Sequence, residues 1–258
     1  MQSDSNILQI DNLSKYFGGL AAVSSCSLQI KKGSITGIIG PNGSGKTTLF
    51  NLIAGNLQPS SGKVVFNNED ITSAPSYELF SKGILRTFQI AHEFTNLTVL
   101  ENLMMVPGNQ SGEKLMTALL KPKLVKEEEE TVKQKAFEVI DFLNLKHLSN
   151  ELAGNLSGGQ KKLLELGRTM MVDAKIVLLD EVGAGVNRTL LKDIGTAILR
   201  LNKEKGYTFC MIEHDMDFIS RMCDPVIVMA EGSVLFEGTP EEVKKNEKVI
   251  ESYLGRGS

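Results

Sequence analysis

The stretch GPNGSGKTTLFNLIAG, residues 40–55, places glycine, lysine and threonine directly ahead of an apolar run with helical character. It matches the pattern GxxxxGK[ST] at Gly40, Gly45, Lys46 and Thr47, and the apolar strand-like segment ITGII precedes it. Glycines let a backbone wrap closely round a polyphosphate, with N–H groups pointing inward at the positive end of a helix. The stretch therefore predicts a phosphate-binding loop within an α/β core.

The chemistry of this loop predicts a nucleoside triphosphate, ATP or GTP, as its ligand. Lys46 places a full charge against the β- and γ-phosphates, Thr47 offers its hydroxyl to Mg²⁺, and Thr48 lies one step further toward the α-phosphate. A glycine-rich turn with no ligand is the alternative. The nucleotide contacts predicted from this stretch are Gly40, Pro41, Asn42, Gly43, Ser44, Gly45, Lys46, Thr47 and Thr48.

Two further segments carry polar groups suited to nucleotide chemistry. The run KIVLLDE is typical of a buried strand that ends in Asp180 and Glu181, where α/β sheets form their ligand crevice. After a phosphate loop, Asp180 is expected to hold the hydration shell of Mg²⁺ and Glu181 to accept a proton from the attacking water. In LSGGQ, Ser157 is a good helix cap and Gly158-Gly159 expose backbone N–H groups. This second anion-ready helix start is either a simple cap or serves a nucleotide held by another subunit.

The pattern of apolar residues predicts one α/β core with a helical insertion. Continuous apolar runs such as SITGIIG, KIVLLDE and YTFCMIEH favour strands buried on both faces of a parallel sheet, whereas SNILQIDNL, SSCSLQI and GKVVFNNEDI favour antiparallel additions. A hairpin is expected to turn at Glu231-Gly232. Helical periodicity replaces the strand pattern from 91 to 156, and the acidic run 127–130 is expected at a helix start. The chain is predicted to form one domain, 1–258, with its core in 1–90 and 157–258.

Composition restricts the classes of function. The chain has 258 residues and a net charge of −3, so it lacks the basic excess of a protein that mainly binds nucleic acid. Its apolar runs are shorter than a membrane span and its N-terminus is unlike a secretory signal, which predicts a cytoplasmic location. Cys26, Cys210 and Cys223 lack metal-ligand spacing and are expected to be buried thiols. No protein-held metal other than Mg²⁺ is expected.

The order and spacing of GPNGSGKT, RTFQ, LSGGQ, IVLLDE and IEHD resemble those of the ATP-binding cassette ATPases over essentially the whole chain. This resemblance implies an α/β P-loop NTPase (RecA-like) core with an N-terminal antiparallel β subdomain and an inserted α-helical subdomain. It also implies a dimer that closes around two ATP molecules with Mg²⁺. In such a dimer LSGGQ of one chain completes the site of the other.

The resemblance implies roles for further residues. Phe17, with Tyr16 as the alternative, matches the aromatic residue that stacks on adenine, and His214 matches the switch histidine that reaches the γ-phosphate. Gln89 matches the glutamine that touches Mg²⁺ and the attacking water and senses the membrane partner, for which residues 90–94 are docking candidates. The residues that match the signature contacts to the opposite ATP are Ser157, Gly158, Gly159 and Gln160.

Four further sequence segments resemble those of the ATPase subunits of branched-chain amino acid importers: YFGGLAAV, LTVLENLM, AGVN and EHDMDFI. This implies permease subunits, a second cassette, identical or different, and indirectly an external solute-binding protein as partners, at the inner face of the membrane. ATPases of urea or amide importers and of a lipopolysaccharide exporter, and non-transport cassettes, are alternatives, whereas a P-loop kinase or GTPase would leave LSGGQ and IEHD unexplained. Val182 and Arg188 replace prolines that are usual in the family, which leaves the loop geometry open.

Overall fold

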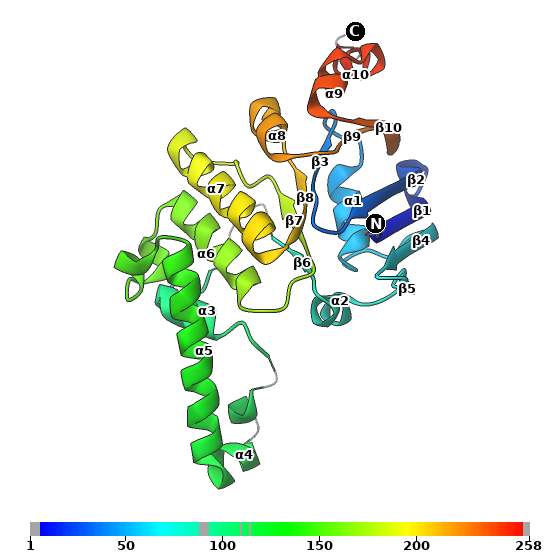
Figure 1. Cartoon of the computed structure of the whole chain (residues 1–258). Helices are drawn as coiled ribbons and strands as arrows, with labels where there is room; N and C mark the ends of the chain where they lie inside the picture. Colours follow the sequence, from blue (N-terminus) through cyan, green and yellow to red (C-terminus); the bar gives the residue numbers. More distant parts are fainter. Residues whose placement is uncertain (1–5, 88–92, 109, 114, 255–258) are drawn as a thin grey trace, which may run out of the picture. The chain divides into compact units, whose positions relative to one another are not determined.

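The computed structural model describes residues 6–87, 93–108, 110–113 and 115–254 (Figure 1). The chain forms two compact units. The first comprises residues 1–89, 174–184 and 198–258, and the second comprises 90–173 and 185–197. The second unit thus runs past residue 156, the predicted end of the helical insertion, as far as residue 173. Each unit is described by itself.

The first unit is built on a six-stranded sheet in the order β10-β9-β3-β8-β7-β6. Its central strands β3 (Ile35–Ile39), β7 (Ile176–Asp180) and β8 (Thr208–Ile212) pair in parallel, and every residue in them is buried. Burial on both faces explains why these strands read as continuous apolar runs. The predicted α/β core with a parallel sheet is therefore confirmed.

The two edges of this sheet differ in how well the sequence predicted them. At one edge β9 (Val226–Ala230) and β10 (Ser233–Gly238) form the predicted antiparallel hairpin, and Glu231 and Gly232 both adopt positive φ in the turn. At the other edge lies β6 (Ile84–Arg86), a short strand that the apolar pattern did not predict.

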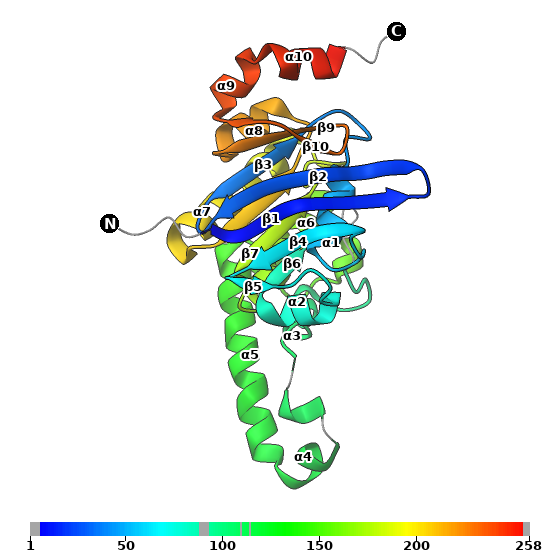
Figure 2. The ribbon, with the colours of Figure 1, turned by 90° about the vertical axis from the view of Figure 1, so that its right-hand side faces the viewer.

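A second, four-stranded antiparallel sheet in the order β2-β1-β4-β5 also belongs to the first unit. Strands β1 (Asn6–Phe17), β2 (Leu20–Lys31) and β4 (Ser61–Phe66) run side by side in Figure 2. The prediction of one strand through GKVVFNNEDI was wrong. Asn67 and Asn68 take left-handed conformations, with φ of 48° and 65°, and turn the chain into the short strand β5 (Glu69–Asp70).

The apolar core of the first unit contains side chains from both sheets together with helix α1 (Lys46–Ile53), which follows the phosphate loop. Leu49, Phe50 and Ile53 of α1 are fully buried there, so the loop is anchored to the core at its C-terminal side. The described part of this unit also contains α2 (Ser76–Lys82), α8 (Met216–Met222), α9 (Pro240–Lys245), α10 (Glu247–Leu254) and the last residues of α7 (Arg188–Lys205), from 198 onward.

The second unit is helical in its described residues. It contains α3 (Val99–Met104), α4 (Leu115–Leu120), α5 (Pro122–Phe142), α6 (Gly158–Met170), the start of α7 (Arg188–Lys205) and the short 3₁₀ turns η1 (Ser111–Glu113), η2 (Lys146–Leu148) and η3 (Ala153–Asn155). Gly167 of α6 lies against Leu143, Val139 and Leu103, where a methyl group would come within 2.8 Å of Leu143. Val139 of α5, with Leu143 just after its end, therefore packs against α3 and α6.

One helix boundary differs from the prediction. Because α5 already begins at Pro122, the acidic run 127–130 lies beyond its first turn rather than at a helix start. Proline at the first helical position, whose N–H is not needed there, accounts for the earlier beginning. No helix in the described part of the chain combines the length and the apolar character that crossing a membrane requires.

Candidate nucleotide-binding site

A cavity of about 400 Å³ lies beside the phosphate loop in the first unit. The segments that form it are distant in sequence: the β1–β2 turn, the phosphate loop, and the residues after β7 and β8. Its lining residues are Phe17, Leu20, Ala21, Ala22, Asn42, Gly43, Gly45, Lys46, Thr47, Thr48, Glu181 and His214. The fold thus brings predicted nucleotide contacts and predicted catalytic side chains to one cavity. Leu20, Ala21 and Ala22 were not predicted, although they directly follow the glycine turn after Phe17.

The phosphate loop has a shape that side chains would not allow at two of its glycines. Gly40 has φ of 151°, and a methyl group there would lie 2.1 Å from the backbone oxygen of Met229. Gly45 caps α1 with φ of 98°, and a methyl group there would lie 2.3 Å from the backbone oxygen of Ala22. Both contacts are with backbone, which cannot move aside easily. The loop is therefore held tightly between β9 and β2. Because Gly45, which lines the cavity, carries no side chain, the loop backbone at this position is open to a ligand.

Lys46 is buried and its ammonium group is held by the loop itself. Nζ donates to the backbone oxygen of Gly40 at 2.8 Å, to that of Pro41 at 3.0 Å, and to Ser44 Oγ at 3.4 Å. The residue is 6% exposed although it lines the cavity. The loop thus keeps a positive charge at its centre, and a triphosphate fits this cradle because its oxygens are stronger acceptors than these carbonyls.

Glu181 and His214, which both line the cavity, contact each other. The carboxylate oxygen Oε1 of Glu181 lies 2.8 Å from Nε2 of His214. Glu181 has the unusual φ of 50°, and its backbone is fixed on both sides, since its N–H donates to Ile212 O and its carbonyl accepts from Ala184 N. A strained residue at the end of a buried strand, paired with a histidine beside a phosphate loop, is the geometry expected of a catalytic base.

Glu213 is a polar residue of this region that the sequence analysis missed. It is 5% exposed, and its carboxylate accepts from Gly183 N at 2.7 Å and from His214 N at 3.3 Å. It therefore joins the loop after Glu181 to the loop that carries His214. Burial raises the pKa of Glu213 above its ordinary value, and the neighbouring charge of Glu181 raises it too, against the two hydrogen bonds that lower it.

The raised pKa of Glu213 predicts a pH-dependent difference in stability. The folded protein binds this proton more tightly than the unfolded chain, so the contribution of Glu213 to wild-type stability decreases as the pH rises from the ordinary value of 4.5 through the folded pKa. Glu213→Gln lacks that decrease. We expect its free energy of unfolding, relative to wild type, to increase with pH across this window in urea titrations. Glu251→Gln, on the exposed surface of α10, is the control and should keep the wild-type slope. A constant difference between Glu213→Gln and wild type would contradict the prediction.

Asp180 is nearly buried and is paired with Arg86 of β6. Arg86 Nη2 donates to Asp180 Oδ2 at 2.7 Å, and Nη1 of the same guanidinium donates to the side chain of Asn51. The strand that the sequence pattern missed therefore supplies the cation that balances a predicted Mg²⁺ residue. Asp180 is not among the residues that line the cavity beside the phosphate loop.

Some predicted site residues lie away from this cavity. Gly40, Pro41 and Ser44 shape the loop and hold Lys46 instead of lining the cavity. Gln89 and residues 90–92 lie outside the described residues. Ser157, Gly158, Gly159 and Gln160 belong to the second unit, where Ser157 and Gln160 form a reciprocal capping box at the start of α6.

The two positions that depart from the usual prolines have ordinary surroundings. Val182 is buried. Arg188 is the first residue of α7, and the preceding Asn187 caps that helix by accepting from Leu190 N at 3.0 Å. Proline is favoured at this helical position but not required there, because the N–H of that residue has no partner within the helix. The capping hydrogen bond that Asn187 accepts therefore preserves the start of α7 without proline.

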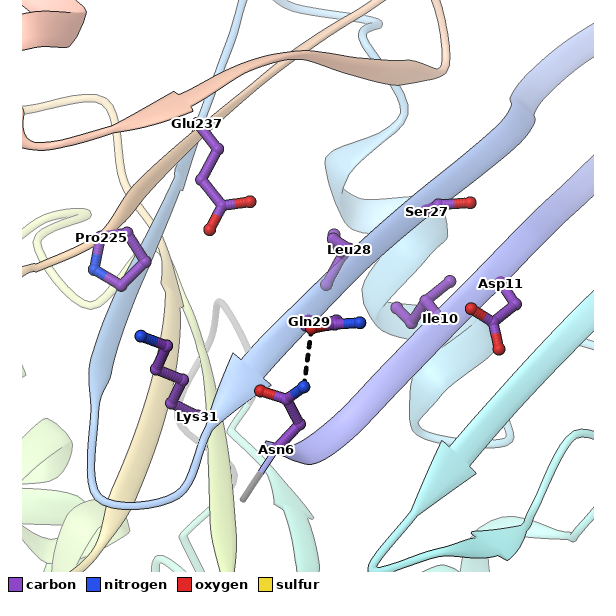
Figure 3. Close-up of a pocket in the computed structure, with 9 residues that line it drawn as sticks. All are labelled: Asn6, Ile10, Asp11, Ser27, Leu28, Gln29, Lys31, Pro225 and Glu237. Atoms are coloured by element: carbon purple, nitrogen blue, oxygen red, sulfur yellow. Dashed lines mark hydrogen bonds between the residues drawn. The ribbon is translucent and has the colours of Figure 1, made fainter. Parts of the chain in front are cut away.

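A second cavity, of about 300 Å³, lies between β1, β2 and the β9–β10 hairpin (Figure 3). In Figure 3, Glu237 and Pro225 stand on one side, and on the other Asn6 donates to the side chain of Gln29 at 2.6 Å. Lys31 and Asp11 contribute opposite charges. None of its lining residues belongs to the motifs of the nucleotide site.

Comparison with known families agrees with this geometry. Residues 23–184 match the family model described as ABC transporter. The chain belongs to the ABC transporter family. Residues 233–258 also match the model described as branched-chain amino acid ATP-binding cassette transporter. The predicted membership of the ABC family is thereby confirmed, and this ABC chain is an ATPase of the family.

Relatives that match over nearly their full length are described as branched-chain amino acid transport ATP-binding proteins. The chain is 46% identical to the probable branched-chain amino acid transport ATP-binding protein LivG of Archaeoglobus fulgidus, over 96% of this chain and 95% of the relative. It is 44% identical to the protein of that description from Methanocaldococcus jannaschii, over 99% and 100%. It is 35% identical to the high-affinity branched-chain amino acid transport ATP-binding protein BraF of Pseudomonas aeruginosa, over 96% and 98%.

Solved structures support the fold of the ABC chain. The ADP conformation of an ATP-binding cassette of an ABC transporter is 41% identical, with a TM-score of 0.83, over 98% of this chain and 100% of that one. A dimeric post-hydrolysis cassette bound to ADP and Pi is 25% identical, with a TM-score of 0.72, over 90% and 98%. The mixed α/β architecture is therefore that of a nucleotide-binding cassette.

Proposed function

We propose that this ABC ATPase hydrolyses Mg²⁺-ATP in the cavity beside residues 40–48 and so drives uptake of branched-chain or similar amino acids through permease subunits. The observation that carries the chemical part is the convergence of Lys46, Glu181 and His214 on one cavity. The class of solute rests on the relatives' names and on the match of residues 233–258 to the branched-chain amino acid cassette model.

Binding of the triphosphate depends on charge and on a bare backbone. Lys46 exchanges its contacts with Gly40 and Pro41 for the β- and γ-phosphate oxygens, while the N–H groups of the loop and of the start of α1 face the remaining oxygens. Phe17, 48% exposed at the edge of the cavity, offers its ring to the adenine. Lys15 Nζ lies 5.3 Å from the centre of that ring.

Hydrolysis requires a base close to the γ-phosphate. Glu181 accepts a proton from a water molecule whose oxygen attacks the γ-phosphorus, the bond to the β-phosphate oxygen breaks, and ADP and phosphate result. His214, 2.8 Å from Glu181, orients this carboxylate and donates toward the γ-phosphate. Thr47, Gln89 and, through water, Asp180 would hold Mg²⁺, which would neutralise charge on the phosphates.

A second cassette completes the site in this proposal. Ser157, Gly158 and Gly159 present a capped helix start that suits a γ-phosphate, and one chain already has a phosphate cradle of its own. A solved relative forms a dimer with ADP and Pi. We take a second copy of this chain as the partner, with permease subunits at the inner face of the membrane and an external solute-binding protein beyond them.

Reconstitution tests the proposed function. The chain is tagged in its native host, purified from membranes with its partners, and placed in proteoliposomes that contain ATP. We expect leucine uptake that stops when the chain carries Glu181→Gln, with Glu237→Gln, outside the nucleotide cavity, as the matched control. Uptake of urea or an amide without leucine would overturn the solute assignment, and purification without any permease would overturn the transport role.

A further inference from the structure

The arm of the second unit ends in an exposed apolar tip. We define the tip as residues 115–126, which comprise α4 and the first part of α5. Figure 1 places α4 at the end of α5 that lies away from α3 and α6. Met116, Leu119 and Leu120 are 66%, 69% and 71% exposed, and Leu124 is 39% exposed. Large apolar side chains gathered at one end of a soluble unit mark an interaction surface.

The tip is also basic, in contrast to the whole chain. It contains Lys121, Lys123 and Lys126 and no acidic residue, which gives a formal charge of +3 where the chain has −3. All three lysines are exposed. The acidic run 127–130 begins directly after the tip, so a block of negative charge follows the three lysines along the arm.

The fold holds this surface in place. Lys121 N donates to Thr117 O at 2.8 Å across the corner between α4 and α5. The carboxylate of Glu128 accepts from both the backbone N and the hydroxyl of Ser111, each at 2.8 Å, which ties η1 to α5. The exposed side chains of Met116, Leu119 and Leu120 therefore lie at a corner that these hydrogen bonds hold together.

We propose that the tip binds the surface of an anionic lipid bilayer. Exposed leucine and methionine side chains enter the boundary between headgroups and acyl chains, and the lysines beside them reach up to lipid phosphates. Charge complementarity selects the lipid, because each basic residue near an anionic surface adds to binding. The carboxylates of 127–130 are repelled by the same surface, so contact stays limited to the tip. This inference goes beyond the proposed function, since it requires neither ATP nor a permease.

Vesicle flotation tests the proposal with the full chain. We expect the protein to float with vesicles of phosphatidylcholine mixed with phosphatidylglycerol, and to remain below with phosphatidylcholine alone or at high salt. Replacing Lys121, Lys123 and Lys126 by glutamine should weaken binding by on the order of 100-fold. The matched control replaces the exposed Lys244, Lys245 and Lys248, which removes the same charge elsewhere and should leave binding unchanged.

The apolar part is tested separately. Leu119→Ser with Leu120→Ser should weaken binding on the order of tenfold or more, whereas Tyr77→Ser, at a 70% exposed position on α2, should not. ATP hydrolysis should be unchanged in all of these variants. Equal binding to both kinds of vesicle, or equal binding by the tip and control variants, would overturn the proposal. The proposal would also be overturned if the wild-type protein did not bind vesicles and the tip variants no longer bound a detergent-solubilised permease.

A site-specific probe gives a readout that does not depend on affinity. Cys26, Cys210 and Cys223 are buried, and burial raises the pKa of the Cys26 thiol to about 11, so a new surface cysteine can be labelled selectively. The fluorescence emission of an environment-sensitive dye on Leu120→Cys should shift to shorter wavelength when anionic vesicles are added. The emission of the same dye on Lys245→Cys should not shift. No shift at residue 120, or equal shifts at both positions, would contradict lipid contact at the tip.

Discussion

Glu181→Gln is expected to reduce the rate of ATP hydrolysis by about 100- to 10,000-fold while ATP binding persists. The amide keeps the size of the side chain and a hydrogen bond with His214, but it cannot accept the proton of the attacking water. The backbone bonds to Ile212 and Ala184 do not involve the side chain, so the strained conformation at φ of 50° is retained. Phosphate release measured beside nucleotide titration separates the two quantities.

The control for this variant is Glu237→Gln, which makes the same chemical change on β10 and should hydrolyse ATP at the wild-type rate. Glu181→Gln with a wild-type rate would assign the proton transfer to another group. Loss of ATP binding together with hydrolysis would mean that Glu181 acts on the structure of the cavity and not as the base.

Lys46→Ala is expected to weaken ATP binding on the order of 100-fold, because charged hydrogen bonds to the β- and γ-phosphates are lost. In the structure the same ammonium holds the carbonyls of Gly40 and Pro41. The variant should therefore also unfold at a lower urea concentration without nucleotide. Both effects are measured on one sample by urea unfolding with and without ATP, since a bound ligand raises the midpoint.

Lys63→Ala is the matched control, because Lys63 is exposed on β4 and does not line the nucleotide cavity. It should keep the ATP-dependent rise in midpoint. If Lys46→Ala kept that rise in full, the loop would bind ATP through its backbone alone. The prediction that the charge of Lys46 strengthens ATP binding would then be wrong.

The features that sequence predicted best are those that local chemistry determines. Strands β3, β7 and β8 are buried on both faces, so their apolar runs gave both their type and their parallel pairing. Positive φ at Glu231 and Gly232 suits a two-residue hairpin, which the dipeptide indicated. The phosphate loop was predicted because glycine, lysine and threonine at fixed spacing have few other uses between a strand and a helix.

The features that sequence missed depend on distant partners. β6 has three residues and is a strand because it pairs with β7, and its Arg86 is needed only once Asp180 is buried beside it. Glu213 was overlooked because its role requires knowing that Gly183 and His214 converge. The turn at Asn67-Asn68 could have been predicted from the sequence, since asparagine tolerates left-handed conformations. The acidic run 127–130 was misplaced because Pro122 begins α5 earlier.

The most direct test of a shared nucleotide site is the solution mass of Glu181→Gln, measured by light scattering with and without Mg²⁺-ATP. Blocked hydrolysis should trap two chains around the nucleotide, so we predict that the mass doubles when Mg²⁺-ATP is added. Adding Ser157→Arg, which places a bulky charge at the capped start of α6, should prevent this doubling and leave ATP binding intact. A mass that stays at one chain while the protein is saturated with ATP would contradict the account.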